Sequence, residues 1–338
     1  MNSPSSAVQA ADSSDFATNL QTLCTWSPGS SSLRLIAYDL HPDYLSSSYA
    51  LARPEAVKVG VQHHHAHVAS AMAEHGVEER VIGVAYDGTG YGLDGTAWGG
   101  EIMVAGYRDF EHVATFRPIA LPGGDAAIRQ PWRTALALLS DAFDGDPPLD
   151  AIPLFRAIRE EDVRVVQQMI ATRFRAPLAH GVGRYFDAVG ALALNRAASR
   201  YEGQIALEWN MAADPDERGC YTWQIDDQTT PWAVDLRPTV RAVVRDLTAG
   251  CSAATISARF HNTLATATAE LVRAVSDACG RYPVVLTGGC FQNARLAETV
   301  LAALAADFAL VLHRDVPPGD GGIALGQAMI ADARARDL

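Results

Sequence analysis

Four of the chain's ten histidines lie within five positions, in the segment VQHHHAHVASAMAEHG at 61–76. The alanine-rich half of this segment predicts a helix, and Gly76 stands where a glycine commonly ends one. Because residues four apart share one face of a helix, His63 and His67 can direct two imidazoles at the same ion, whereas the two histidines between them point elsewhere. The alternative is a polar histidine run on a surface helix. The apolar segment 57–61 before the pair and an acidic, glycine-rich turn after it favour a metal site.

The composition is that of an ordinary globular protein, and it narrows the range of partners. The chain has 338 residues, of which 49% are hydrophobic, so it can bury one large core or two medium ones. A formal net charge of -12 argues against nucleic acid as the main partner. The five cysteines form no CxxC pair, which excludes a cysteine zinc ribbon. No signal-peptide pattern and no apolar run of about 18 residues occur, so we expect a cytoplasmic protein without a membrane partner.

A second motif joins two predicted strands. The stretch VIGVAY at 81–86 predicts a strand that runs into DGTGYGLDG at 87–95, and another strand is predicted at 102–107. This order resembles the phosphate-holding hairpins of actin-like ATPases, in which backbone N–H groups face the anion and the carboxylate serves the metal. DGTG alone is often an ordinary hairpin turn. The histidine pair one strand upstream makes the phosphate interpretation stronger.

Further turns carry glycines or acids after predicted strands. LTGGCFQN at 286–293 predicts a strand that ends at Gly288 and Gly289 before a helix, which suits close approach to a nucleotide. Asp320 heads the last helix, where it is either a plain N-cap or an acid with a further role, like the aspartate of DGTG. Asp187 is likewise either a helix cap or a contact to a ribose or a metal.

The rest of the chain predicts mainly helices. Apolar residues recur at helical spacing in four segments, which are 126–143, 154–174, 185–198 and 253–279. Strands are predicted at 33–39, 57–61, 283–287 and 308–313, and a hairpin at 220–225 and 232–236. The Ser-, Ala- and Asp-rich residues 1–15 are expected to be disordered, and a short helix is predicted at 16–24.

Seven motifs occur in a fixed order: DLHPDYLS (39–46), VQHHHAHVASAMAEHG (61–76), DGTGYG with GTAWGGE (87–101), LPGGDAAIRQPWR (121–133), YEGQ (201–204), LTGGCFQN (286–293) and PPGDGGIALGQA (317–328). With these motifs the chain resembles, over about residues 16 to 336, the C-terminal domain of the hydrogenase-maturation carbamoyltransferases, the HypF family. That domain in turn resembles the tRNA threonylcarbamoyl transferase subunit.

The resemblance implies an α/β protein with the two-lobed actin-like ATPase (ASKHA) fold. The first lobe would span 16–125 and contain the metal-binding helix and the phosphate hairpin. The second lobe would span 126–338, with a helical insertion and nucleotide-binding turns. The family domain normally opens with a β-hairpin that 1–15 does not resemble, so we expect a first lobe that is truncated at its N-terminus.

The resemblance also implies an activity. A carbamoyl-adenylate would bind between the lobes, and its carbamoyl group would pass to the C-terminal cysteine of a HypE-like acceptor protein during synthesis of the cyanide ligand of NiFe hydrogenase. No CxxC zinc module or YrdC-like domain is present, so a separate YrdC-like protein would make the adenylate. The acceptor supplies the thiol, and no residue of this chain is assigned as a catalytic nucleophile.

Site residues follow from the same resemblance. An iron or zinc ion would be held by the metal ligands His63, His67, Asp87 and Asp320. ATP or carbamoyl-adenylate, with magnesium, would contact Gly88, Thr89, Gly90, Gly288, Gly289 and Asn293. The ribose and base would lie near Gly183, Asp187 and Glu202.

Two other interpretations belong to different classes. A degenerate or truncated paralogue would bind metal, nucleotide or a partner without catalysis of its own, and the missing hairpin favours this view because an incomplete sheet exposes an edge. A metallopeptidase is disfavoured, since no glutamate follows His63 as HExxH requires. The intact metal and nucleotide motifs favour the transferase.

Overall fold

The computed structural model describes residues 35–54 and 57–336, and the chain divides into two compact units, Met1–Val61 and Gln62–Leu338. The disorder predicted for 1–15 and the short helix predicted for 16–24 lie outside the described residues. The predicted boundary between lobes at 125/126 stays a prediction. Strands from both sides of that boundary take part in one sheet of the second unit.

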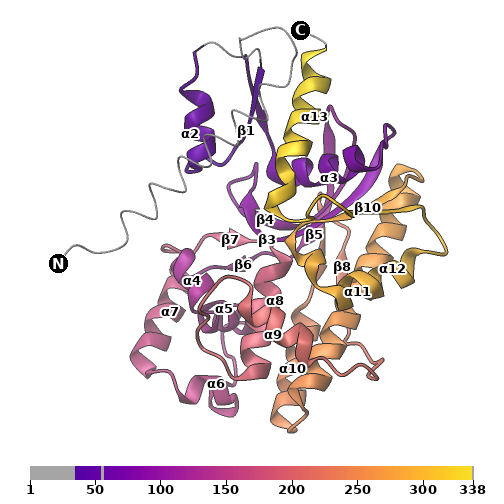
Figure 1. Cartoon of the computed structure of the whole chain (residues 1–338). Coiled ribbons are helices and arrows are strands. Elements are labelled where there is room, and N and C mark those ends of the chain that lie inside the picture. The colour runs from indigo at the N-terminus through magenta and orange to yellow at the C-terminus, as the bar shows by residue number, and fades with distance from the viewer. Residues whose placement is uncertain (1–34, 55–56, 337–338) are drawn as a thin grey trace. The chain divides into compact units, whose positions relative to one another are not determined.

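In the first unit, a helix connects two parallel strands (Figure 1). β1 (Leu35–Asp39) pairs with β2 (Val57–Val61), and α2 (Leu45–Leu51) lies between them in the chain. The hydroxyl of Ser47 donates to the carbonyl oxygen of Asp39 at 2.6 Å, which ties the helix to the end of β1. The strand predicted at 57–61 is confirmed at both ends.

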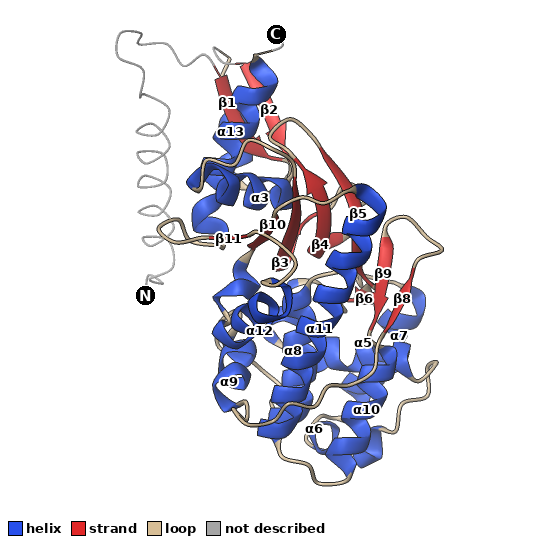
Figure 2. Ribbon diagram, turned by 90° about the vertical axis from the view of Figure 1, so that its right-hand side faces the viewer, coloured by secondary structure: helices blue, strands red, loops and turns tan. Residues whose placement is uncertain are grey.

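A mixed sheet runs through the described residues of the second unit (Figure 2). Its order is β11-β10-β3-β4-β5-β9-β8, with β7 paired to β4 and β6 to β7. β10 lies parallel to both neighbours, whereas β3, β4 and β5 are antiparallel. The predicted hairpin is confirmed as the antiparallel pair β8 and β9, although its first strand begins at Gln224 and not at 220. The strands are β3 (Val81–Tyr91), β4 (Ala97–Ala105), β5 (Phe110–Phe116), β6 (Ile119–Ala120), β7 (Leu178–Ala179), β8 (Gln224–Asp226), β9 (Trp232–Asp235), β10 (Val284–Thr287) and β11 (Leu310–Leu312).

The strand boundaries predicted on both sides of the DGTG segment are wrong. β3 runs to Tyr91 because, after a register shift between Tyr86 and Gly90, Gly90 and Tyr91 pair again with β4. β4 already begins at Ala97, since the GTAWGGE segment pairs with this extension. The segment predicted as a phosphate hairpin therefore contains a register shift within a long antiparallel strand pair.

Eleven α-helices of the second unit are described, in addition to three short 3₁₀ segments at Leu149–Ala151, Gly289–Gln292 and Asp320–Gly322. None of the described helices is both long and apolar enough to cross a membrane. The α-helices are α3 (His63–Glu74), α4 (Asp125–Arg129), α5 (Trp132–Ala142), α6 (Pro153–Arg156), α7 (Glu160–Thr172), α8 (Val182–Leu194), α9 (Gln204–Ala212), α10 (Arg237–Thr248), α11 (Ala253–Cys279), α12 (Ala294–Leu304) and α13 (Ile323–Ala335).

The helix predictions are wrong mainly where a segment predicted as one helix forms two helices in the structure. The segment 126–143 breaks at Pro131, which has no N–H to continue a helix. The segment 154–174 divides into α6 and α7. α8 begins earlier than predicted and ends at Leu194, because Asn195 adopts a left-handed conformation with φ of 54°. The prediction of 253–279 as one helix is confirmed at both ends by α11.

Alternate residues of β3 face two separate cores, as the period-two geometry of a strand requires. Ile82, Val84 and Tyr86 belong to the larger core, whereas Val81 and Ala85 belong to a smaller one. Figure 1 shows α3 and α13 on one side of the sheet and α5, α8 and α11 on the other. The end of β3 therefore brings its loop between a helix pair and a helical layer.

α3 and α13 approach so closely that one contact requires glycine. A Cβ atom on Gly326 would lie 1.9 Å from the carbonyl oxygen of Ala66. The Ser70 hydroxyl donates to the carbonyl oxygen of Gly322 at 2.8 Å near the start of α13. This contact fixes the C-terminal helix, and with it the turn at 317–322, against the histidine helix.

We expect Gly326→Ala to destabilise the protein by about 1–3 kcal/mol, because the added methyl overpacks the α3–α13 contact. Alanine is otherwise favoured over glycine inside a helix by up to about 1 kcal/mol, so helix propensity acts in the opposite direction. Urea unfolding measures the difference. Unchanged or increased stability would contradict the close packing, and Ala328→Val on the exposed side of the same helix is the control.

Candidate metal and nucleotide site

The N-terminus of α3 is fixed by the residue that precedes it. The side-chain oxygen of Gln62 accepts the backbone N–H of His65 at 2.9 Å, and its Nε2 donates to the carbonyl oxygen of Tyr91 at 3.0 Å. This cap ties the first turn of the histidine helix to the end of β3. His63 and His67 are each 1% exposed, so the interpretation as a polar run on a surface helix is wrong.

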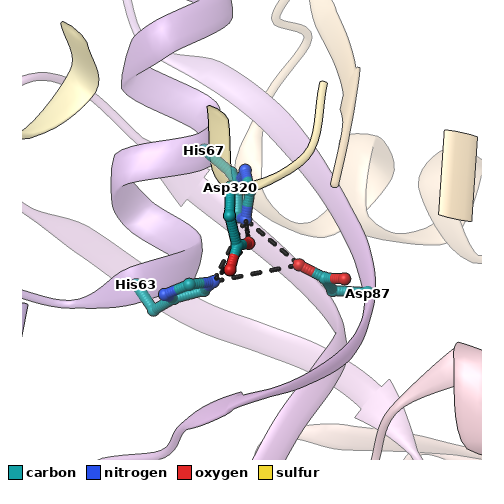
Figure 3. Close-up of side chains that lie close together, drawn as sticks. All are labelled: His63, His67, Asp87 and Asp320. Atoms are coloured by element: carbon teal, nitrogen blue, oxygen red, sulfur yellow. Dashed lines mark hydrogen bonds and ion pairs between the residues drawn. The ribbon is translucent and has the colours of Figure 1, made fainter. Parts of the chain in front are cut away.

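Four side chains from three segments converge beside this turn (Figure 3). His63 and His67 extend from the same helix, and Asp87 and Asp320 face them. The Nε2 atoms of the two histidines lie 3.2 Å apart. Asp87 Oδ2 lies 3.1 Å from His67 Nε2 and 3.8 Å from that of His63. Asp320 Oδ1 lies 3.4 Å from His63 Nε2 and 3.6 Å from that of His67.

These separations match a shared cation. Ligand bonds of about 2.1 Å place the donor atoms of a tetrahedral site about 3.4 Å apart, and the five separations range from 3.1 to 3.8 Å. All four donor atoms lie within 4.8 Å of one another. Two imidazoles and two carboxylates form a nitrogen and oxygen donor set that suits zinc or iron. These four side chains, His63, His67, Asp87 and Asp320, are called the quartet below, and they fit a metal ion.

The electrostatics of the quartet point the same way. Burial raises the pKa of Asp87, but the two histidines outweigh this effect and hold it well below its usual value. Burial lowers the pKa of His67, but its hydrogen bonds to the carboxylates of Asp320 and Asp87 outweigh this effect and raise the pKa. The site therefore favours ionised carboxylates together with a positive charge between them, which a metal ion provides.

The far end of α3 holds the loop that delivers Asp320. One carboxylate oxygen of Glu74 accepts the backbone N–H groups of 314–316 at 2.6–3.2 Å, and the other accepts from His313 at 3.1 Å. Although burial raises it, these donors lower the pKa of Glu74 to about 2. One helix thus supplies two of the four candidate ligands and anchors the segment that carries a third.

The other two histidines of the cluster do not reach the quartet, as predicted. The ring of His65 lies 2.6 Å from the carbonyl oxygen of Gly106, and the ring of His64 lies 3.3 Å from Gln62 Nε2. Burial lowers the pKa of His64 to about 3 and that of His65 to about 4. Both are neutral core side chains at pH 7.

A cavity of about 370 Å³ lies next to the quartet and shares Asp87 with it. Its walls come from the DGTG turn, the start of α8, the segment 201–210 and the turn before α12. Six of the nine residues expected to contact nucleotide line it: Gly88, Gly183, Asp187, Glu202, Gly289 and Asn293. The structure thus brings together four segments that the sequence placed far apart.

The other three expected nucleotide contacts lie elsewhere. Gly90 packs against the histidine cluster, where an added Cβ would lie 2.6 Å from the ring of His64. Gly288 has φ of 93°, and its Cβ would lie 2.2 Å from the carbonyl oxygen of Tyr86. Neither Gly90, Gly288 nor Thr89 is among the residues that line the cavity. Gly90 and Gly288 instead permit close packing around the turns.

Glycines also press the start of α8 against the DGTG turn. A Cβ on Gly181 would lie 1.9 Å from the carbonyl oxygen of Gly88, and one on Gly183 would lie 2.8 Å from the Cα of Gly88. Asp187 lies inside α8, whose N-cap is Gly181. The interpretation of Asp187 as a helix cap is therefore wrong.

Sequence reasoning missed Arg184, which the structure buries beside the cavity with 3% of its side chain exposed. Its Nη2 lies 3.2 Å from Asp187 Oδ2 and 3.0 Å from Glu202 Oε1, while Nε and Nη1 have no partner among the described residues. It is the only Lys or Arg among the described residues that line the cavity. The sequence does show that Arg184 lies three residues before Asp187 in a helical segment, a spacing that allows an ion pair. Burial raises the pKa of Asp187, and Arg184 opposes that rise.

Known proteins with similar sequences share this domain. Residues 83–327 match the family described as Carbamoyltransferase, Kae1-like Domain, second subdomain, and residues 8–74 match the HypF Kae1-like domain. The chain belongs to the HypF carbamoyltransferase family. The match to the HypF Kae1-like domain begins inside the segment 1–15, in which we found no family motif.

Curated relatives are similar over most of this chain. Carbamoyltransferase HypF2 of Cupriavidus necator is 38% identical, over 89% of this chain and 40% of its own length. Carbamoyltransferase HypF of Synechocystis is 36% identical, with the same coverage of both chains. A HypF homolog of Cupriavidus necator is 38% identical and is covered over 78% of its length. This chain thus spans about two fifths of the first two relatives.

Solved structures share the fold. Full-length HypF in a phosphate- and nucleotide-bound form superposes with a TM-score of 0.84 at 36% identity, over 89% of this chain and 39% of that one. HypF of T. kodakarensis gives 0.78 at 28% identity, over 90% and 41%. The actin-like ATPase fold expected from the sequence is confirmed.

We expect the purified chain to contain about one metal ion, and His63→Ala/His67→Ala to contain almost none, because two of four ligands are removed. Elemental analysis after reconstitution with iron or zinc measures this. His75→Ala, at the other end of the same helix, is the control and keeps its metal. A wild-type chain that takes up no metal would contradict the site.

We expect Arg184→Met to destabilise the fold by about 3–5 kcal/mol, because it leaves Asp187 buried without its partner. Arg184→Met/Asp187→Asn removes both charges and regains a large part of that loss. Chemical unfolding of both variants separates the two cases. Equal stability of the single variant and the wild type would show that the buried ion pair is not a structural requirement.

Proposed function

We propose that this chain transfers a carbamoyl group from a carbamoyl-adenylate to a thiol of an acceptor protein. The observation that carries the proposal is the shared position of Asp87, which is both one of four converging ligand groups and part of the wall of the adjacent cavity. A carbamoyl-adenylate in the cavity, which is a mixed anhydride, would thus present its reacting carbonyl group next to the metal quartet.

The names of the relatives support a carbamoyltransferase, and the structure titled as phosphate- and nucleotide-bound supports a nucleotide site in this fold. The first two relatives are much longer than this chain, which spans about two fifths of their length. Their remaining parts have no counterpart in the matched region. We propose that a separate YrdC-like protein supplies the adenylate, formed from ATP with magnesium.

Within the cavity, each polar group has a role that its chemistry suits. Asp187 and Glu202 would accept hydrogen bonds from ribose hydroxyls, as acceptor-only carboxylates do. Arg184, the positive side chain in the wall of the cavity, would face the negative charge of the phosphate. Its Nη2 also lies close to Gly88, so the guanidinium and the backbone turn form one surface of the cavity.

The ion would be held by His63, His67, Asp87 and Asp320, and iron or zinc would supply a positive charge that polarises a carbamoyl or phosphate oxygen. The chain's own residues hold and orient the adenylate and position its acyl carbon. Cys290 lines the cavity, but burial raises the pKa of its thiol well above the ordinary value, so it is a poor nucleophile.

The acceptor would therefore be a HypE-like protein with a C-terminal cysteine. Its sulfur forms a bond with the carbamoyl carbon while the bond from that carbon to the phosphate oxygen breaks. AMP leaves with the electron pair, and the thiol proton passes to solvent. We place this reaction in the cytoplasm, in the maturation of NiFe hydrogenase, with no role for nucleic acid.

The test combines the chain, a purified YrdC-like protein that makes carbamoyl-adenylate, and an acceptor with a C-terminal cysteine. We expect mass spectrometry to find a carbamoyl group on that cysteine only when the wild-type chain is present, and not with His63→Ala/His67→Ala. A chain that binds metal and nucleotide but yields no adduct would contradict the transferase and favour a binding module.

A further inference from the structure

A buried histidine behind the cavity has no role in the proposed reaction. His261 lies in the middle of α11 and is 0% exposed. Its ring packs against two aromatic rings, with centroids 5.0 Å from Phe186 and 5.8 Å from Trp209. Burial lowers its pKa to about 4, so the ring is neutral at pH 7 and carries a single N–H.

The position of that proton follows from the groups around Nδ1. The carbonyl oxygen of Ser257 lies 2.7 Å from Nδ1 and can only accept. The Ser257 hydroxyl lies 3.4 Å from Nδ1, but it donates its own hydrogen to the carbonyl oxygen of Trp209 at 2.6 Å. Nδ1 therefore faces two acceptors and must carry the hydrogen, which leaves a lone pair on Nε2.

Nε2 in turn faces the side chain of Asn293, with the amide nitrogen 2.8 Å away. The amide must donate to the lone pair, so its nitrogen points at His261. An independent contact agrees, because Asn293 Oδ1 accepts the backbone N–H of Leu296 at 3.1 Å as the N-cap of α12. Two separate constraints thus give Asn293 one orientation.

Asn293 also lines the cavity. Its oxygen caps the helix and one of its two N–H groups is taken by His261, so the remaining N–H is the group that it can offer to a ligand. A ligand oxygen that accepts a hydrogen bond suits this position. A donor group of a ligand would face another donor there and could form no hydrogen bond.

We propose that His261 is a positioning residue, which through its Nε2 lone pair holds the Asn293 amide so that the cavity presents a hydrogen-bond donor to an acceptor oxygen of the nucleotide. This inference rests on the proposed nucleotide role of the cavity. His261 does not line the cavity, so its effect on nucleotide binding would pass through Asn293.

The first test is the tautomer, which a merely space-filling histidine would not fix. Long-range ¹H–¹⁵N spectra of ¹⁵N-histidine-labelled protein, assigned with His261→Gln, should show a neutral ring protonated at Nδ1 at pH 7. A ring protonated at Nε2, or an imidazolium, would overturn the proposal.

The second test is AMP affinity by calorimetry. His261→Leu should weaken AMP binding roughly three- to tenfold, the effect of one hydrogen bond. His261→Gln, which can place an acceptor near the position of Nε2, should stay within about twofold of wild type. Asn293→Asp keeps an acceptor that caps the helix but loses the donor, and should weaken AMP binding by roughly tenfold or more.

The control is Asn262→Ala, since Asn262 is next to His261 but donates away from the cavity, to the carbonyl oxygens of Glu217 and Gly219. It should leave AMP affinity unchanged. If wild type binds AMP and His261→Leu binds it equally well, the positioning role is wrong while the nucleotide cavity stands, whatever the affinity of Asn293→Asp. If wild type does not bind AMP, the nucleotide cavity and this inference both fail.

Discussion

The central constraint in this molecule is the convergence of four ligand groups around one point. Two imidazole nitrogens 3.2 Å apart and two carboxylates within reach of both cannot share a mostly buried site unless a positive charge lies among them. Every neighbouring feature serves this arrangement. The Gln62 cap fixes the start of α3, the glycine contact with α13 fixes the C-terminal turn, and Asp87 lies where the β3–β4 pairing shifts register.

The same turn connects the ion site to the cavity. Asp87 faces the histidines, while Gly88 beside it is pressed against the start of α8 and lines the cavity. One backbone segment thus carries both a candidate metal ligand, Asp87, and a wall residue of the proposed nucleotide cavity, Gly88. A ligand in the cavity and an ion in the quartet would act on a single group, which is the geometric basis of the proposed transfer.

Local patterns predicted the elements well where one signal dominated. α11 has a serine cap and a glycine at its end, and β2 is a short apolar run between a proline-containing loop and the histidine helix, so their bounds were correct. Boundaries failed where long-range pairing decided them, as in the extension of β3 to Tyr91. The HxxxH pair was predictable from helix geometry, whereas the approach of Asp320, more than 250 residues later in the chain, came only from the family resemblance. Arg184 and His261 were missed because a polar residue inside an apolar helix does not show what it contacts.

The most direct test is a crystal structure of the chain grown with zinc or iron and AMP, with anomalous data at the metal edge. The account predicts one anomalous peak bonded to His63, His67, Asp87 and Asp320, and AMP in the adjoining cavity with its phosphate directed toward that peak. A metal bound by other residues, or AMP bound away from the turn at Asp87 and Gly88, would contradict it.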